Sequence, residues 1–130
     1  MFNTHNIIGH NNAYKMSQGS GLRGYVTVSY DELCRVFGRP IEIDGEDKVQ
    51  VQWIIRFEVV NEIDGSTYSV VATIYDWKVG PQYVGIQGVP YQQVTHWHIG
   101  GHRMSDSEPV RLVHEALGQT VDKALQPAHV

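Results

Sequence analysis

Residues 49–60 constrain the fold more than any other part of the chain. They read VQVQWIIRFEVV, with an apolar side chain at every odd position and Gln, Arg or Glu at most even positions. Successive side chains of a β-strand point to opposite faces of a sheet. The pattern therefore predicts a strand with one face toward a core and one mostly polar face.

A second strand is expected to follow across a tight turn. Asp64-Gly65 is a strong hairpin signal, and residues 66–78 supply another apolar segment after it. A loop of these two residues alone gives a register with Phe57 opposite Ala72, Ile55 opposite Ile74 and Arg56 opposite Thr73. The apolar faces of both strands then coincide, which favours an antiparallel hairpin.

Two helices are expected to flank the hairpin in sequence. Ser29 and Glu32 have the spacing of a capping box, which predicts a helix start directly after a short strand at residues 22–28. Ser105 and Glu108 repeat this motif before a C-terminal stretch with helical apolar spacing. One helix is therefore predicted before the central strands in the sequence, and one after them.

The order of these elements predicts an α+β fold, an antiparallel β-sheet with two helices packed on one face. Residues 94–99 form the last expected strand, after a Gly- and Pro-rich loop at 79–92. Residues 1–21, rich in Asn, Ser and Gly, are expected to form a flexible N-terminal arm. Residues 22–130 are expected to form a single domain.

Composition excludes several classes of function. The net charge is −4 over 130 residues, which argues against a partner of duplex nucleic acid. Cys34 is the single cysteine, so a disulfide framework and a cysteine zinc site are excluded, and a cytoplasmic location is expected. No apolar run approaches the roughly 20 residues of a membrane span, so no membrane partner is expected.

The segments VATIYDWK and THWHIGGH carry the most chemistry. His96 and His98 lie two apart on a predicted strand, so both point away from the face that carries Trp97. Arg56 and Tyr75 lie on the corresponding face of the hairpin. A wall of aromatic and hydrogen-bonding side chains suits a flat polar ligand such as a nucleotide.

Three further features have two interpretations each. Arg103 follows a glycine pair near a helix start, a combination that suits either an anion site or a turn that needs positive φ. Arg56 can bind a phosphate or pair with Glu58. Tyr83 can close over a ligand or pack its loop on the sheet. The ligand site predicted from these residues comprises Arg56, Tyr75, Tyr83, His96, His98 and Arg103.

The histidines also permit a metal centre. His96, His98 and His102 could bind zinc through imidazole nitrogens. No carboxylate stands at a companion spacing, and the chain has no H-E-x-x-H helix. We therefore predict no metal, no other cofactor and no catalytic residue. A small His-ligated metal-dependent enzyme stays an alternative.

Several segments together resemble one known family. They are YDEL at 30–33, F-G-x-P at 37–40, VQWIIRF at 51–57, D-G at 64–65, VATIYDWK at 71–78, Y-x-G at 83–85 and THWHIGGH at 95–102. This pattern, which covers about residues 22–117, resembles the first type of phage Thoeris anti-defence proteins. Residues 1–21 are not part of the resemblance.

The resemblance implies a function in immune evasion. Proteins of that family act as signal sponges: they bind cyclic ADP-ribose isomers made by bacterial TIR-domain enzymes and do not cleave them. The resemblance also implies homo-oligomers with pockets near subunit interfaces and, in some members, separate sites for cyclic oligonucleotides. Family pockets use arginines and an aromatic side chain, for which Arg56, Tyr83 and Arg103 are the candidates.

We therefore expect a non-enzymatic phage protein that sequesters a cyclic nucleotide signal in the host cell cytoplasm. A protein-binding inhibitor domain is the other alternative, because the helix ending F-G-R-P followed by aromatic strands also resembles small bacterial inhibitor and lipoprotein domains, an analogy of fold alone.

Overall fold

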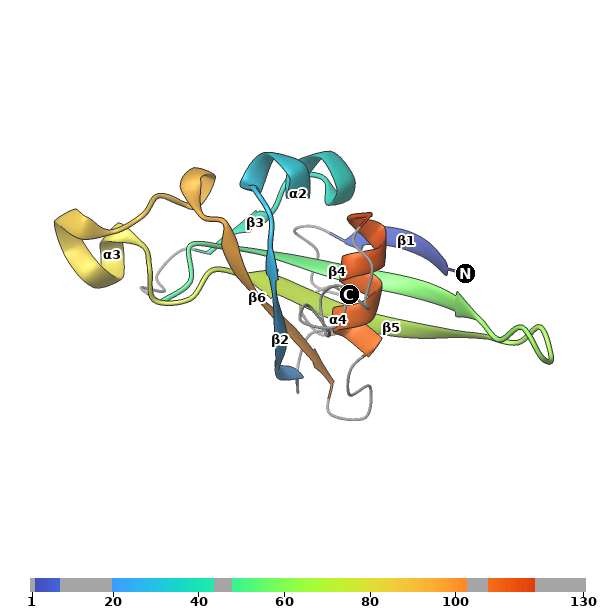
Figure 1. The fold of residues 1–130 in the computed structure, drawn as a ribbon. Coiled ribbons are helices and arrows are strands. Elements are labelled where there is room, and N and C mark those ends of the chain that lie inside the picture. The colour runs from blue at the N-terminus through green and yellow to red at the C-terminus, as the bar shows by residue number, and fades with distance from the viewer. Residues whose placement is uncertain (1, 8–19, 44–47, 103–107, 119–130) are drawn as a thin grey trace, which may run out of the picture.

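The computed structural model describes residues 2–7, 20–43, 48–102 and 108–118. Its centre is a fully antiparallel sheet with the strand order β1-β4-β5-β6-β2, and the two-residue β3 pairs with β4 beside this path (Figure 1). The strands are β1 (Phe2–Ile7), β2 (Ser20–Thr27), β3 (Ile41–Glu42), β4 (Val51–Val60), β5 (Thr67–Tyr75) and β6 (His96–His102).

Two helices, α2 (Tyr30–Phe37) and α4 (Glu108–Ala116), pack on one face of this sheet and share its core. Helix α2 buries Leu33 and Phe37, and α4 buries Leu112 and Val113. The predicted α+β class is therefore confirmed. No helix in the described ranges is long and apolar enough to cross a membrane.

The core contains the four side chains that the strand pattern predicts to be buried. Trp53, Phe57, Ile74 and Trp97 are all fully inaccessible. Each of these comes from a core-facing position of β4, β5 or β6, where every second side chain points at the helices. The alternation of apolar residues thus predicts the buried face of the sheet correctly.

The predicted register of the hairpin is wrong by two residues. Phe57 lies opposite Val70, and Arg56 opposite Val71. The turn is longer than Asp64-Gly65: the Asn61 N–H donates to the Ser66 carbonyl, and the Gly65 N–H donates to the Asn61 carbonyl. A shift of two residues preserves which face each side chain points to, so the core prediction survives the error.

The prediction of a flexible arm at residues 1–21 is wrong for its two ends. Phe2–Ile7 form β1, which pairs with β4 from Phe2–Val59 to Ile7–Ile54. Ser20 and Gly21 begin β2. Strand pairing uses main-chain groups, and without β1 this edge of β4 would leave N–H and C=O groups unpaired. An Asn-rich segment can therefore form a strand that composition does not indicate. Residues 8–19 lie outside the described ranges.

The start of α2 agrees with the predicted cap. The Glu32 N–H donates to the Ser29 hydroxyl at 3.1 Å. The Glu32 carboxylate, however, pairs with the Arg35 guanidinium, which replaces the second half of the capping box. Ser105, predicted to cap the C-terminal helix, lies outside the described residues.

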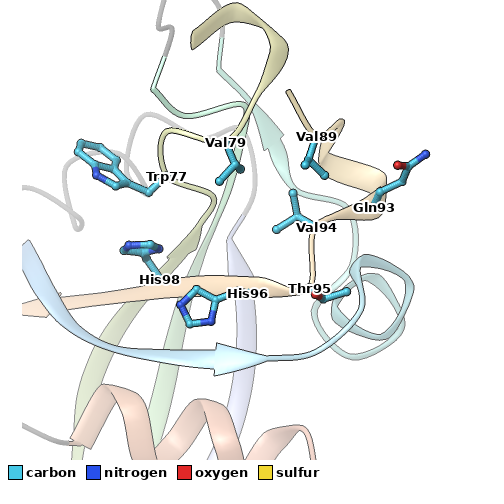
Figure 2. A pocket seen from close by; sticks show the side chains of 8 residues that line it. All are labelled: Trp77, Val79, Val89, Gln93, Val94, Thr95, His96 and His98. Carbon is cyan, nitrogen blue, oxygen red and sulfur yellow. The ribbon is translucent and has the colours of Figure 1, made fainter. Parts of the chain in front are cut away.

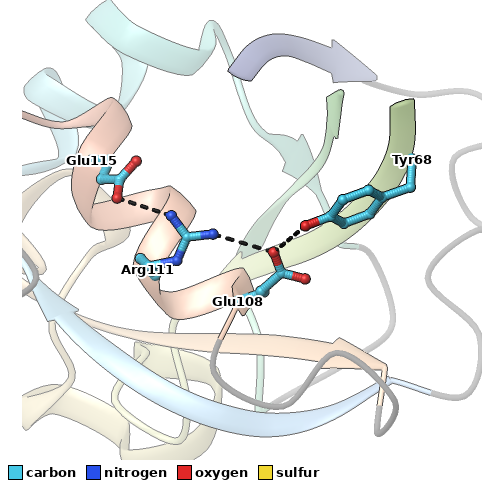
Figure 3. Close-up of polar contacts among 4 residues, drawn as sticks. All are labelled: Tyr68, Glu108, Arg111 and Glu115. Atoms are coloured by element: carbon cyan, nitrogen blue, oxygen red, sulfur yellow. Dashed lines mark hydrogen bonds and ion pairs between the residues drawn. The ribbon is translucent and has the colours of Figure 1, made fainter. Parts of the chain in front are cut away.

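Helix α4 is joined to the sheet by a polar network at its first turn. The Tyr68 hydroxyl of β5 donates to the Glu108 carboxylate at 2.6 Å (Figure 3). The Arg111 guanidinium bridges Glu108 at 3.2 Å and Glu115 at 3.0 Å. These contacts are exposed, so they orient the helix while the buried side chains supply most of its stabilisation.

The predicted loop at residues 79–92 contains short helical turns. They are α3 (Pro81–Val84) and two 3-10 turns at Gly85–Gln87 and Tyr91–Gln93. Figure 1 shows this loop at one end of the molecule and the β4–β5 turn at the opposite end. The loop leads back into β6, and that connection positions the candidate site.

Candidate ligand-binding site

Five aromatic and imidazole rings gather on the face of the sheet that points away from the helices. They form what we call the ring surface: Tyr25, Tyr75, Trp77, His96 and His98. His98 pairs across the sheet with Tyr25 on β2 and with Tyr75 on β5. Because Trp97 points into the core, both histidines of β6 point to the ring surface.

The rings contact one another in sequence across three strands. The Tyr25 and His96 rings are stacked, with centroids 5.0 Å apart and an interplanar angle of 22°. Tyr25 meets His98 edge-on at 4.9 Å, and His98 lies 5.5 Å from Tyr75. Trp77 extends the series, 6.4 Å from His98. Tyr25 and Trp77 are 47% and 39% exposed, a concentration of accessible aromatic area that is typical of a ligand site or an interface.

A hollow of about 220 Å³ lies beside the ring surface and is called the first hollow here (Figure 2). Its described lining residues are Trp77, Val79, Val89, Gln93, Val94, Thr95, His96 and His98. Figure 2 shows the three valines close together, His96 and His98 on β6, and Trp77 at the edge with its indole directed away from the valines. The valines and the indole make the walls apolar, and the histidines and Thr95 add hydrogen-bonding groups along the β6 side.

The wall of the first hollow is fixed to the sheet by Asp76 and Gln50. Asp76 is fully buried, and its carboxylate accepts hydrogen bonds from the Gln50 and Val51 N–H groups at 2.8 and 3.1 Å and from the Gln50 side-chain amide at 2.9 Å. The same amide nitrogen donates to the Val89 carbonyl at 3.0 Å. The Val89 N–H in turn donates to the Val79 carbonyl. These hydrogen bonds join the loop to β4 and position Val89 beside the hollow.

Two rings of the site are shifted toward their neutral forms. Burial and the neighbouring His96 lower the pKa of His98, and Asp76 opposes this only in part. The His98 Nδ1 atom is buried with no partner in the described part of the chain. Burial also raises the pKa of Tyr75, so its hydroxyl stays protonated. The shifts of both pKa values favour the uncharged form of the ring.

One cation lies at the rim of the ring surface. The Lys78 ammonium is 5.5 Å from the Trp77 ring centroid and 5.8 Å from that of Tyr83. Lys78 adopts a positive φ of 60°, and its N–H donates to the Lys48 carbonyl. This backbone turn places its charge beside the aromatic wall.

The structure brings together three of the six predicted site residues, Tyr75, His96 and His98. Tyr83 lies on the exposed α3 and approaches the site only through Lys78. Arg103 lies outside the described residues. In the first hollow, sequence reasoning missed the valines and Gln93, because no periodic pattern marks a loop that folds back over a strand.

Arg56 is separate from the other predicted residues. Its guanidinium lies 3.7 Å from the Glu58 carboxylate, which agrees with the interpretation of an ion pair. The partner of Tyr75 on β4 is Gln52, four residues from Arg56. At a rise of ~3.3 Å per residue this separates them by about 13 Å. The expectation that Arg56 lies beside Tyr75 is wrong, because it depended on the two-residue error in register.

Tyr25 was also missed, and for a different reason. It alternates correctly along β2, but its place in the site depends on the pairing of β2 with β6, which joins residues about 70 positions apart in the chain and has no local signal. Within the described residues, no group of three His, Cys, Asp or Glu side chains could hold a metal ion.

Comparison of the chain with protein-family models, with curated proteins and with solved structures finds no match.

Proposed function

We propose that this protein binds a nucleotide-type small molecule on the ring surface and in the first hollow without cleaving it. The observation that carries the proposal is the unbroken series of rings from Tyr25 to Trp77 beside a preformed hollow. Every nucleobase has a π-face, and stacking on an aromatic side chain contributes about 1–3 kcal/mol per base.

The charges of the site suggest how such a ligand lies. Among the described residues that line the first hollow, none carries a permanent charge, and three are valines. A neutral ring therefore suits the hollow better than a phosphate does. Lys78 at the rim is the described cation closest to the Trp77 ring, so the phosphates lie outward, beside Trp77.

The chemistry of the lining supports binding without cleavage. Its two histidines are of a type that can act as a general base, but none of its described residues is an Asp, Glu, Cys or Ser. The nearby Asp76 carboxylate already accepts three hydrogen bonds from the chain and is fully buried. A group committed in this way cannot approach a ligand as a general base, which must lie within hydrogen-bond reach of the proton it removes.

The resemblance to phage anti-defence proteins supplies the biological role in this proposal. We infer that the protein sequesters a cyclic nucleotide immune signal during phage infection, with a cyclic ADP-ribose isomer as the first candidate ligand. We further infer that it forms a homo-oligomer in the host cytoplasm. The exposed Tyr25 and Trp77 support this assembly, because a second copy could shield the site from water.

Calorimetry with cyclic ADP-ribose isomers, linear ADP-ribose and inorganic pyrophosphate tests the proposal. We expect the cyclic compounds to bind and pyrophosphate not to bind. The bound compound should then be released by denaturation and identified by mass spectrometry. Recovery of the unaltered compound supports sequestration, whereas an altered product would establish an enzyme and overturn the proposal.

A protein-binding function is the second candidate, and the tip of the loop favours it. Ile86 is fully exposed at 102%, and Val84 and Tyr83 are 45% and 42% exposed. Because the Val79–Val89 hydrogen bond closes this loop, the apolar tip is presented on a rigid support. Rigid apolar anchors are typical of protein interfaces.

The two candidates depend on different residues. In cells that carry a TIR-based defence, loss of phage protection by Trp77→Ala but not by Ile86→Ser supports the nucleotide site. The reverse result supports a protein partner at the loop tip.

A further inference from the structure

We propose that a second hollow, which Trp77 also lines, binds a nucleobase-like ring that carries a hydrogen-bond donor and acceptor on one edge. This inference rests on the proposed function and deepens it, because Tyr75 and Trp77 of the ring surface also line the second hollow. The second hollow has a volume of about 210 Å³ and shares only Trp77 with the described lining of the first. Gln52, Thr73 and Tyr75 provide its polar groups.

The sheet register builds this site from three strands. Gln52 of β4 pairs with Tyr75 of β5, and Thr73 of β5 pairs with Gly100 of β6. All of these positions point away from the core because they alternate with the buried residues Trp53, Ile74 and Ile99. The site therefore lies on β4, β5 and β6, the three central strands of the sheet.

The hollow depends on a glycine. A Cβ atom at Gly100 would lie 2.5 Å from the Thr73 hydroxyl oxygen and 3.5 Å from the Tyr75 ring. The backbone of Gly100 does not require glycine, since it is not among the residues with positive φ. A side chain is excluded at this residue because its Cβ would collide with the Thr73 hydroxyl. A glycine inside a strand is characteristic of a place where another group approaches the backbone closely.

The polar groups of the second hollow have no competing partners. Neither the Gln52 amide nor the Thr73 hydroxyl makes a side-chain hydrogen bond with any residue of the described ranges, although Thr73 is only 3% exposed. Thr73 lines the hollow, so its hydroxyl and the Gln52 amide are available to a bound molecule. A hydrogen bond that a ligand makes with these groups in place of water contributes about 0.5–1.5 kcal/mol.

These groups define the class of ligand. A glutamine amide offers one donor and one acceptor in a plane, the arrangement that pairs with N6 and N7 of adenine. Tyr75 and Trp77 meet edge-to-face at 6.2 Å and 80°, so one of the two rings can stack on a flat ligand while the other borders its edge. The first hollow also carries a glutamine, Gln93, among its valine walls, so a matched substitution there separates the two sites.

Binding of adenosine and purine riboside, which lacks the 6-amino group, tests this inference. The exposed Trp77 reports binding by fluorescence, because Trp53 and Trp97 are fully buried. We expect purine riboside to bind about tenfold more weakly than adenosine, since one hydrogen bond in a desolvated site corresponds to about that factor. In Gln52→Leu, adenosine should weaken to the level of purine riboside.

Gln93→Leu is the matched control, because it makes the same chemical change in the lining of the first hollow. It should leave the preference for adenosine unchanged. Gly100→Ala should abolish adenosine binding, and Gln52→Leu keeps the test decisive if that variant does not fold.

Three results would overturn the inference: equal affinities of the parent protein for the two nucleosides, an unchanged preference in Gln52→Leu, or the same loss in Gln93→Leu. The proposed function fails separately, because it requires cyclic nucleotide binding that Gln52→Leu need not affect.

Discussion

The indole rings of Trp53 and Trp97 meet edge-to-face in the core, with centroids 5.3 Å apart and an interplanar angle of 81°. Each indole N–H donates to a carbonyl at a different end of α2. Trp53 bonds to Gly38 after the helix at 2.8 Å, and Trp97 bonds to Val28 before it at 3.0 Å. One aromatic pair therefore fixes both ends of the helix to the middle of the sheet.

Trp53→Phe should destabilise the fold by about 1–3 kcal/mol, because it leaves the Gly38 carbonyl without its buried donor and removes core volume. Urea unfolding monitored by circular dichroism measures this. Trp77→Phe is the matched control: its side chain is 39% exposed, so its free energy of unfolding should change by no more than about 0.5 kcal/mol. Equal effects of the two substitutions would mean that the Trp53 hydrogen bond contributes nothing.

Phe57→Ala should cost about 3–5 kcal/mol, as expected for the deletion of a fully buried ring. Phe57 packs edge-to-face on Phe37 of α2 at 6.5 Å, so the substitution also removes contacts between helix and sheet. The same denaturation experiment applies, with Ile63→Ala as control because Ile63 is 96% exposed in the β4–β5 turn. A loss below half a kilocalorie for Phe57→Ala would contradict its place in the core.

Asp76→Asn should loosen the wall of the first hollow. The asparagine amide can accept fewer of the three hydrogen bonds and presents its own N–H groups to Gln50 or Val51. We expect a loss of at least ~2 kcal/mol in stability, and faster hydrogen exchange at the Val89 amide. Asp64→Asn, in the exposed turn, controls for loss of charge. Unchanged exchange at Val89 would show that Asp76 does not hold the loop.

The thermal stability should rise with pH as the solution approaches neutrality. The pKa of His98 in the folded protein lies below the ordinary value of a histidine because of burial and the neighbouring His96, so the unfolded chain binds this proton more readily. The free energy of unfolding therefore increases with pH between the folded-state and the unfolded-state pKa of His98. Above the unfolded-state pKa, His98 no longer destabilises the fold. Melting temperatures of His98→Gln should show a weaker slope over this window, and His96→Gln should weaken it by less, because His96 causes only part of the shift of the His98 pKa. An unaltered slope in His98→Gln would contradict the prediction.

Local patterns predict this fold well where a residue's environment depends on its own strand or helix. The alternation in β4 identifies Trp53 and Phe57 as core residues. The spacing of Ser29 and Glu32 identifies Ser29 as a helix cap. Local patterns fail where the environment of a residue depends on how two strands pair. The turn between β4 and β5 uses main-chain hydrogen bonds of Asn61 together with side-chain bonds of Asn61 and Asp64, which make it longer than the Asp64-Gly65 pair indicates. The resulting register separates Arg56 from the site.

The candidate site illustrates the same division. His96, His98 and Tyr75 share a face by alternation alone, so sequence reasoning finds them. The walls of the first hollow come from Val79 and Val89, which are placed by the Asp76–Gln50 hydrogen bonds. Such bonds join residues 26 and 39 positions apart and leave no periodic trace in the sequence.

The corrected register gives a prediction opposite to the one that the sequence suggests for Arg56. Trp77→Ala should weaken binding of a cyclic ADP-ribose isomer by about tenfold to a hundredfold, because it removes a stacking surface that contributes about 1–3 kcal/mol. Arg56→Ala should change the affinity by less than about twofold, since its guanidinium pairs with Glu58 about 13 Å along the sheet from Gln52 and Tyr75. Calorimetry on both variants decides between the two placements. Melting temperatures close to that of the parent are required of each variant, so that a loss of binding is not a loss of fold. If Arg56→Ala abolishes binding and Trp77→Ala does not, the ligand lies on the β4 side of the sheet and the ring surface is not its site.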